Sequence, residues 1–421
     1  MLTVDFVLAY PQADIDSETY IKLPRGVDFG AGISGSTHIL KLLKNIYGLK
    51  QAGRVWNQHL HRGLVRLKFE QSKYDPCVYY RGNVVMAIYI DDCLIIAPSD
   101  AEVIKVYSDL KTKFEVTNEG PIDEYLGVKV EKRDGKSMKL SQPLLTQQIL
   151  DEMGFNLRTK GRSTPALSSQ ILERDKDGKR KITAWDYRSI LGKLNYLEKS
   201  TRPDIAYAVH QCARFAADPK ESHIQAMLHI GRYLHSTKDR GLIYQPKTQS
   251  FDLWCDADFS GNWSPETAHI DASTAKSRTG FVITFAGCPI AWTSKLQTEV
   301  ALSTTEAEFI ALSEGLRSAI PLISLVTEMR DKGVPMTWCQ PKIHCRVFED
   351  NNGALAIART PRYRPRTKHI NIKYWHFIEY VTKHNIEILP VDSKDQLADI
   401  FTKPLAKELF EKLRDGIQGM E

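Results

Sequence analysis

Residues 84–97 read VVMAIYIDDCLIIA, two apolar runs of strand length on either side of Asp91 and Asp92. This pattern predicts a β-hairpin that carries the two aspartates at its tip. Adjacent carboxylates at a partly buried tip repel one another by kilocalories unless a cation lies between them. The hairpin therefore indicates a metal site. A solvated turn is the alternative that the pair, taken alone, leaves open.

A third acid, Asp5, opens another strand-like stretch, residues 5–10 (DFVLAY). Aspartates from different strands can hold two divalent ions about 4 Å apart, an arrangement that serves phosphoryl transfer. Asp5, Asp91 and Asp92 are therefore the candidate ligands of a first metal site.

The length and composition exclude several classes of protein. The chain has 421 residues, 42% of them hydrophobic and 26% charged, which predicts two or three folded domains and argues against a disordered or fibrous protein. Its net charge of +6 is small, so a polyanion would have to bind at local basic patches. No apolar run approaches the roughly 18 residues of a membrane span. We expect no secretory signal, and seven cysteines without a CxxC pair favour reduced thiols in an intracellular protein.

Changes of pattern along the chain predict four segments. Residues 1–157 mix strands and helices, and residues 158–250 hold a basic linker followed by helices, one of which starts at Pro203. Residues 251–405 again alternate strands with helices, which indicates a second α/β domain. Residues 406–421 are expected to form a C-terminal tail.

Four further acids occur at the ends of successive predicted elements of the second α/β domain. They lie on a first strand, on a helix, after the next buried strand and near the last helix: Asp256, Glu308, Asp350 and Asp399. Each of them, taken alone, is compatible with a surface residue. Asp258 is an alternative to Asp256. Glu306 is an alternative to Glu308, since two acids two residues apart on a helix cannot both face one pair of ions.

The first set of residues resembles a known family. Residues 89–92 (YIDD) resemble the Tyr-X-Asp-Asp signature of reverse transcriptases. Residues 46–52 (IYGLKQA) are similar to a characteristic segment of copia-type LTR retrotransposon polyproteins, although Gly53 stands where that family usually has proline. The resemblance implies a polymerase palm whose metal ligands are the three aspartates named above. It also implies that Tyr10 lies under the nucleotide sugar, where a ring would clash with a 2′-hydroxyl, and that Gln51 contacts template or nucleotide.

The second set resembles the ribonuclease H domain of the same polyproteins. Residues 303–312 (STTEAEFIAL) and 396–405 (QLADIFTKPL) carry this resemblance. It implies that the four acids bind two magnesium ions around a scissile RNA phosphate. Residues 359–383 are basic, a pattern that predicts phosphate binding, for example through Arg362, Arg364 and Arg366, with a solvated loop as the alternative. The family pattern around Lys368 and His369 supports a role on the hybrid.

The predicted fold class is therefore α+β and α/β. A reverse transcriptase palm and thumb would be followed by a helical connection and a ribonuclease H-like α/β domain. The family's fingers region is missing, because only four residues precede Asp5. We thus expect an N-terminally truncated fragment of a polyprotein.

The expected function is that of an RNA-directed DNA polymerase with ribonuclease H activity. The expected cofactor is Mg²⁺, two ions per active site, with Mn²⁺ as a substitute. The expected partners are an RNA template, a DNA primer, an RNA/DNA hybrid and deoxynucleoside triphosphates, with no membrane. The expected location is a cytoplasmic virus-like particle or the nucleus. Two alternatives stay open: a catalytically silent remnant that at most binds nucleic acid, and a fragment with nuclease activity alone.

Overall fold

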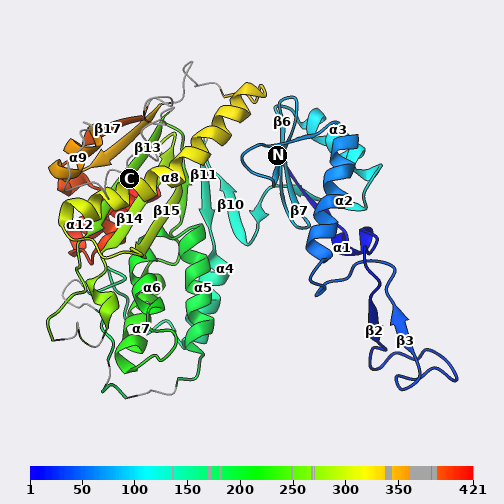
Figure 1. Cartoon of the computed structure of the whole chain (residues 1–421), viewed down its shortest axis with the longest axis horizontal. Helices are drawn as coiled ribbons and strands as arrows, with labels where there is room; N and C mark the ends of the chain where they lie inside the picture. The colour runs from blue at the N-terminus through cyan, green and yellow to red at the C-terminus, as the bar shows by residue number, and fades with distance from the viewer. Residues whose placement is uncertain are drawn as a thin grey trace. The chain divides into compact units, whose positions relative to one another are not determined.

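The computed structural model describes the whole chain except residues 135–136, 168–171, 176, 180–182, 248–249, 267–268, 270, 337–343, 360–380, 382–385 and 421. The chain divides into two compact units. Unit 1 comprises residues 1–126 and 324–336, and unit 2 comprises residues 127–323 and 337–421. Figure 1 gives the element labels used below.

Unit 1 is built on a six-stranded sheet in the order β4-β5-β6-β7-β1-β8. Its strands are β1 (Leu2–Phe6), β4 (Glu70–Gln71), β5 (Val78–Arg81), β6 (Val84–Tyr89), β7 (Asp92–Ile96) and β8 (Val116–Pro121). Strands β6 and β7 pair antiparallel, which confirms the predicted hairpin. A separate pair, β2 (Tyr20–Lys22) and β3 (Ile39–Lys41), follows α1 (Ala9–Gln12) in the chain, and β9 (Glu124–Tyr125) ends the unit's first segment.

The predicted strand over residues 5–10 is wrong beyond Phe6. Leu8 has a φ of +48°, in the left-handed region that ends a strand, and Tyr10 lies in the short helix α1. The sequence misled here because the run Phe6–Tyr10 is apolar throughout, as a buried strand would be.

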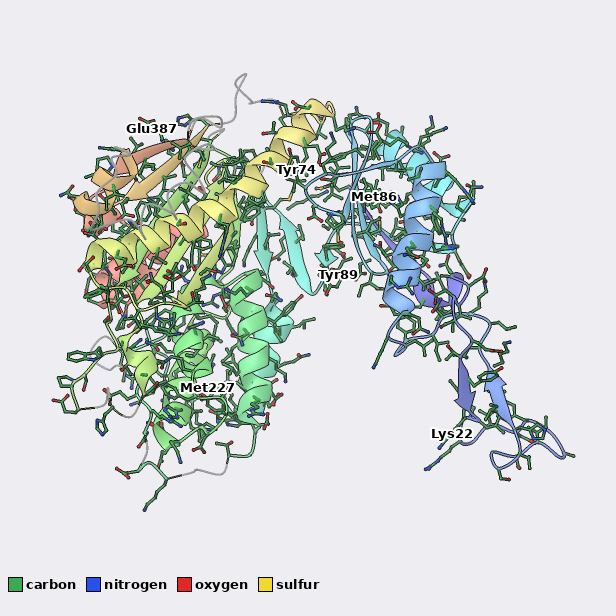
Figure 2. All side chains as sticks on the ribbon, in the orientation of Figure 1. Lys22, Tyr74, Met86, Tyr89, Met227 and Glu387 are labelled. Carbon is green, nitrogen blue, oxygen red and sulfur yellow. The ribbon has the colours of Figure 1, made fainter. Side chains whose placement is uncertain are left out.

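Two helices build the core of unit 1 with the sheet. Helix α2 (Ala52–Arg66) buries Trp56, Leu60 and Leu64, which share one face at helical spacing. Helix α3 (Asp100–Lys111) has Ser99 as its N-cap, and the Ser99 hydroxyl accepts a hydrogen bond from the Glu102 amide. Met86 of β6 is fully buried in this core (Figure 2).

The first part of unit 2 joins strands from two distant parts of the chain. Strand β10 (Val128–Lys132) pairs with β11 (Met138–Ser141), and β11 pairs with β12 (Leu242–Tyr244). The compact units divide between residues 126 and 127, inside the predicted segment 1–157, which was expected to hold a palm and the start of a thumb. The β11–β12 pairing ties residues 127–157 to unit 2 across about a hundred residues of chain, and no local pattern reports it.

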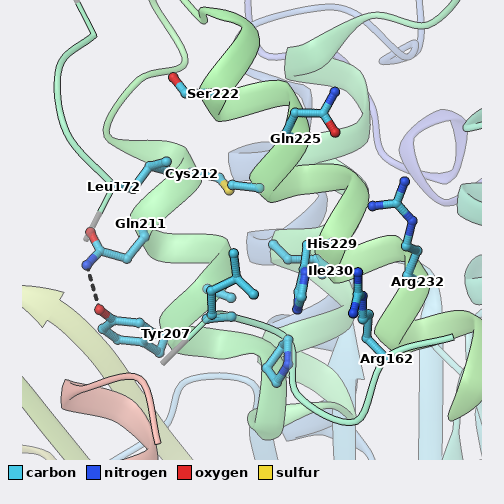
Figure 3. Close-up of a pocket in the computed structure, with 15 residues that line it drawn as sticks. Arg162, Leu172, Tyr207, Gln211, Cys212, Ser222, Gln225, His229, Ile230 and Arg232 are labelled. Carbon is cyan, nitrogen blue, oxygen red and sulfur yellow. Dashed lines mark hydrogen bonds between the residues drawn. The ribbon is translucent and has the colours of Figure 1, made fainter. Parts of the chain in front are cut away.

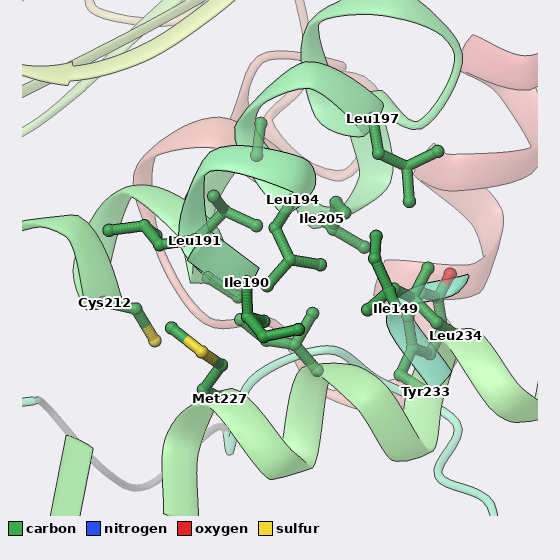
Figure 4. Packing of buried hydrophobic residues seen from close by; sticks show 14 of the residues in the cluster. Ile149, Ile190, Leu191, Leu194, Leu197, Ile205, Cys212, Met227, Tyr233 and Leu234 are labelled. Atoms are coloured by element: carbon green, nitrogen blue, oxygen red, sulfur yellow. The ribbon is translucent and has the colours of Figure 1, made fainter. Parts of the chain in front are cut away.

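Four helices build the main core of unit 2: α4 (Pro143–Glu152), α5 (Tyr187–Ser200), α6 (Ala206–Ala213) and α7 (Glu221–Ser236). Ile149, Ile190, Leu194 and Met227 meet inside it (Figure 4). The predicted helix start at Pro203 is confirmed, since a 3₁₀ turn over Pro203–Ile205 leads into α6.

The predicted C-terminal tail is instead a packed helix. Helix α12 (Lys407–Gln418) buries Phe410, Leu413 and Ile417 in the core of α4–α7. These three residues recur at helical spacing, so the pattern was present in the sequence.

The rest of unit 2 is a five-stranded sheet in the order β15-β14-β13-β16-β17. Its strands are β13 (Phe251–Asp258), β14 (Arg278–Phe285), β15 (Cys288–Leu296), β16 (Cys345–Glu349) and β17 (Ile386–Pro390). The first three pair antiparallel, and β16 and β17 run parallel to β13. The helices in this part are α8 (Thr304–Asp331), α9 (Asn352–Arg359) and α11 (Asp399–Thr402), with 3₁₀ turns at Ala272–Ala275 and Ser393–Asp395. This is the second α/β domain that the sequence predicts.

The sheet shares its core with the helices. Val282 and Trp292 of the sheet, and Ile400 and Phe401 of α11, belong to the same buried cluster as α4–α7. The Trp292 indole N–H also donates to the carbonyl of Glu198 on α5, at 2.8 Å. The two predicted segments 158–250 and 251–405 therefore fold around one core.

Helix α8 is the one described helix that is long and apolar enough to cross a membrane by length and composition. Half of its most apolar window is buried inside the protein. Phe309, Leu312 and Leu316 are fully buried, and Glu308 is buried among other acids. These features are those of a core helix.

Candidate metal-binding sites

Three acids from three elements of unit 2 meet in one cluster. Asp256 lies near the end of β13, Glu308 in the first turns of α8, and Asp350 directly after β16. Because β13 and β16 are parallel neighbours, their carboxyl ends lie at the same edge of the sheet. Each of the three acids offers a carboxylate oxygen, and these oxygens all lie within 4.8 Å of one another.

The cluster has the burial and charge of a cation site. Asp256 and Glu308 are 2% and 4% exposed. Burial, followed by Asp256, Glu349 and Asp350, raises the pKa of Glu308 to about 11. Its Oε2 atom has no hydrogen-bond partner among the described residues. Buried carboxylate oxygens without partners suit a hard divalent cation such as Mg²⁺, so the three acids fit such an ion.

The fourth predicted acid, Asp399, lies beside this group. It is the first residue of α11, and burial, followed by the charge of Asp256, raises its pKa to about 7. One lysine reaches both carboxylates: Lys403 Nζ is 2.9 Å from Asp399 Oδ1 and 3.6 Å from Asp256 Oδ2. The Thr402 hydroxyl also donates to Asp256 Oδ2.

The aspartates of unit 1 form a second acidic site. Asp5 of β1 lies directly opposite Asp92 of β7. Ile90, at the hairpin tip, has a φ of +59°, and its carbonyl accepts a 2.8 Å hydrogen bond from the indole N–H of Trp56 on α2. This contact holds the tip, and Asp91 with it, over the end of β1, where the Asp91 carbonyl accepts a hydrogen bond from the Phe6 amide.

The pKa values in unit 1 show the mutual repulsion of these acids. Burial raises the pKa of Asp5, and Asp91, Asp92 and Glu119 raise it further. Burial, then Asp91 and Glu119, likewise raise the pKa of Asp92. A cation between the carboxylates would relieve both effects. Within the described residues, the aspartates of this site are more widely spaced than the 4.8 Å group of unit 2.

Comparisons with known proteins match the chain along most of its length. Residues 1–168 match the family described as reverse transcriptase (RNA-dependent DNA polymerase). The chain is 31% identical to the retrovirus-related Pol polyprotein from transposon TNT 1-94 of Nicotiana tabacum, over 98% of this chain and 30% of that protein. It is 32% identical to the corresponding polyprotein from transposon RE1 of Arabidopsis thaliana, over 97% of this chain and 27% of that protein. The chain is similar to Pol polyproteins of copia-type retrotransposons over most of its length. This confirms the resemblance seen in the sequence.

The chain spans less than a third of the length of these two relatives. Among solved structures, LC11-RNase H1 isolated from compost is 17% identical and covers 39% of this chain and 98% of that protein, with a TM-score of 0.27. The same enzyme in complex with an RNA/DNA hybrid gives a TM-score of 0.26. The predicted fold class, mixed α and β, is confirmed by the sheets and helices of the two units.

The structure distinguishes the alternative metal ligands that the sequence left open in unit 2. Glu306 Oε2 accepts the amide of Leu302 at 2.9 Å and so serves the start of α8, whereas Glu308 enters the cluster. Asp258 lies opposite Arg278 on β14 and is outside the cluster of three.

Three residues near the acidic sites were missed from sequence. Glu349 is fully buried, and burial is the main cause that raises its pKa to about 8. Strand alternation could have revealed it, because Cys345, Val347 and Glu349 share the buried face of β16. Lys403 and Glu119 carried no such signal.

Tyr10 is linked to the acidic site of unit 1 through Tyr47, whereas the described contact of Gln51 is with Ser17. The rings of Tyr10 and Tyr47 have centroids 4.5 Å apart, and the Tyr47 hydroxyl donates to Asp91 Oδ2 at 3.4 Å. The Gln51 amide donates to the Ser17 hydroxyl at 3.3 Å, just before α2. The predicted nucleic-acid contacts Arg362, Arg364, Arg366, Lys368 and His369 lie outside the described residues.

A cavity of about 360 Å³ opens among the helices of unit 2. Figure 3 shows Tyr207, Gln211 and His229 among its lining residues, with the Gln211 amide donating to the Tyr207 hydroxyl. None of the predicted metal ligands lines it.

Proposed function

We propose that unit 2 carries a ribonuclease H that cleaves the RNA strand of RNA/DNA hybrids, and that the chain also carries the palm of an RNA-directed DNA polymerase. The observation that carries the nuclease is the convergence of Asp256, Glu308 and Asp350 on one point, with Asp399 beside it. These are the four acids that the resemblance implies, and they come from four elements spread over about 140 residues of chain.

The chemistry follows from the charge of the cluster. Asp256, Glu308, Asp350 and Asp399 would hold the Mg²⁺ ions, which would supply an activated water and charge stabilisation for cleavage of a phosphodiester. The protein's own residues set the geometry. Asp256 is fixed by the Thr402 hydroxyl, and Asp350 Oδ2 accepts a 2.9 Å hydrogen bond from the Ser393 hydroxyl. A nucleic-acid phosphate, itself negative, is then attracted only when cations occupy the site.

The matched pair Glu308→Gln and Glu306→Gln tests the nuclease. Both change one carboxylate to an amide on α8, two residues apart, but only Glu308 belongs to the cluster. The full chain would be assayed on a hybrid with labelled RNA in the presence of Mg²⁺. Removing one ligand should cost several kcal/mol of transition-state stabilisation, a loss of about 10³-fold, while Glu306→Gln keeps its rate. Equal cleavage by both variants would refute the assignment.

The second function rests on a separate observation. Asp5 and Asp92 are direct cross-strand partners, and the Ile90 turn holds Asp91 beside them. Deoxynucleotide selection would come from Tyr10, whose ring packs on Tyr47 at this site. Primer extension on an RNA template should be lost in the variant Asp91→Asn. Extension at the same rate by this variant would show that the hairpin acids do not catalyse it.

Magnesium, the RNA template, the DNA primer and the deoxynucleotides belong to this proposal. A catalytically silent remnant is the competing candidate. It predicts hybrid binding without Mg²⁺-dependent cleavage, so the assays above separate the two.

A further inference from the structure

A lysine ammonium lies within ion-pair distance of two of the proposed metal ligands. Lys403 directly follows α11, and its side chain is 39% exposed, whereas those of Asp256 and Asp399 are 3% and 6% exposed. The ammonium thus reaches two buried carboxylates from the solvent side of the site. A flexible four-carbon stem lets such a group leave without moving the backbone.

Lys403 is also the main compensating charge of this cluster. Among the described residues it is the cation that lowers the pKa values of Asp256 and Asp399, against the larger effect of burial. Among the described residues, no cation is one of the leading causes that shift the pKa values of Glu308 and Glu349, the other buried acids beside it. The described part of the cluster is therefore divided. Its Asp399 side holds the positive charge of Lys403, whereas no described cation is a leading influence on its Glu308 side.

We propose that Lys403 is a built-in counter-ion that competes with a divalent cation for the Asp256–Asp399 side of the cluster. In the free protein, one divalent ion binds at the Asp256, Glu308 and Asp350 oxygens, and a second binds only when the ammonium has left. Lys403 is a positioning residue in this scheme, and the released ammonium is free to pair with a phosphate of the hybrid. This inference rests on the proposed nuclease function.

The scheme has a physical advantage for a site with so many acids. Four like charges within a few ångströms would repel one another by several kcal/mol in the absence of metal. An ammonium on a mobile stem lowers that repulsion and holds Asp256 and Asp399 in place. Because it carries one charge and the ion carries two, a divalent ion can displace it.

Metal binding to the full chain without nucleic acid tests the proposal. All variants would carry Asp91→Asn and Asp92→Asn, so that the site in unit 1 does not contribute bound ions. Mn²⁺ binding would be counted by electron paramagnetic resonance, and Mg²⁺ binding by calorimetry. Lys403→Met should tighten the binding about tenfold or more and add a second bound ion, since one neighbouring charge shifts such equilibria by one or more decades.

Two controls match this variant. Lys412→Met removes a lysine whose ammonium is 2.6 Å from Asp395, outside the cluster, and should leave metal binding unchanged. Lys403→Arg keeps the charge and should bind one ion, as the parent does. If Lys403→Met fails to fold, as judged by circular dichroism, Lys403→Gln takes its place, because its amide keeps a hydrogen-bond donor without the charge.

The outcomes distinguish this inference from the proposed function. If the parent binds no divalent ion, or if Glu308→Gln leaves its binding unchanged, the metal site itself fails. If Glu308→Gln removes the ion but Lys403→Met binds with unaltered affinity and number, the proposed function stands and the role of Lys403 is refuted. Weaker binding by Lys403→Met refutes it as well.

Discussion

Gly280 offers a direct test of whether α11 positions the nuclease acids. It lies on β14 directly opposite Asp256. A Cβ atom added there would lie 2.6 Å from Thr402 Cγ2, 2.8 Å from Phe401 Cβ and 3.0 Å from the Ala398 carbonyl oxygen. Ordinary contacts begin at 3.4 Å. In Gly280→Ala, α11 would therefore have to move outward by on the order of 0.5–1 Å, since a packed interior has no free space to absorb the methyl group.

This displacement predicts two measurable losses. Overpacking of this kind costs about 1–3 kcal/mol of unfolding free energy. The moved helix carries Asp399 and Thr402 and is followed by Lys403, all of which touch the cluster. A shift of about 1 Å in such groups lowers a catalytic rate by up to about 10²-fold. We therefore expect the cleavage rate to fall about 10- to 100-fold while the fold is kept.

The assay compares initial rates of hybrid cleavage by the full chain at saturating Mg²⁺, together with urea unfolding. Gly192→Ala is the matched control, because it adds the same methyl group in α5, where no heavy atom lies within 4 Å. It should keep the cleavage rate and gain about 0.5–1 kcal/mol of stability from helix propensity. A Gly280→Ala protein with the parent's rate and stability would refute the idea that α11 is held against this strand.

Three further predictions concern other parts of the chain. The buried guanidinium of Arg202 donates to Asp204 at 2.8 Å, so Asp204→Ala should lower the unfolding free energy measured in urea by about 3–5 kcal/mol. Removal of Lys394, which forms an exposed ion pair with Asp392, should lower it far less. Burial and Arg278 lower the pKa of His210 to about 3. The unfolded chain therefore binds a proton that the folded chain excludes, and stability should fall by up to about 4 kcal/mol from pH 6.5 to 3. His210→Gln should flatten this fall, and an equally steep curve would contradict the assignment. Replacing Arg362, Arg364 and Arg366 by Ala should reduce the slope of log hybrid affinity against log salt concentration by up to about three. An unaltered slope would mean that these arginines do not contact the hybrid phosphates.

The sequence predicted the elements whose pattern is local. The hairpin over residues 84–97 followed from two apolar runs around a polar pair, and both of its strands are present. Asp5 was paired with this hairpin from its apolar context and the family resemblance, and the register places it opposite Asp92. A strand that pairs with its sequence neighbour is set largely by residues that lie close together in the chain.

The domain boundaries could not be predicted in the same way. The pairing of β11 with β12 joins residues about a hundred positions apart, and neither strand exceeds four residues. The strand expected as far as Tyr10 failed for a different reason, since the left-handed turn at Leu8 is rare for a leucine.

The order of acids along the chain, together with the resemblance to ribonuclease H, pointed to Asp256, Glu308 and Asp350. Their meeting point depends on the parallel register of β13 and β16, which sequence patterns do not give. The same register brings Glu349 close to Asp256. Lys403 was not recognised because its partner Asp256 is 147 positions away, and a lysine after a short helix is common on surfaces.

The shared core of unit 2 limits where recombination between related retrotransposon sequences can yield a folded protein. Val282, Trp292 and Phe401 from the sheet region are packed among α4–α7. A crossover near residue 250 between two diverged copies would combine helices from one copy with the sheet of the other. Buried side chains in the shared core would then pack against neighbours with which they did not evolve. A crossover near residue 127 keeps this core within one parent. Functional hybrids between related elements should therefore be found with breakpoints close to residue 127, and rarely between the helices and the nuclease sheet.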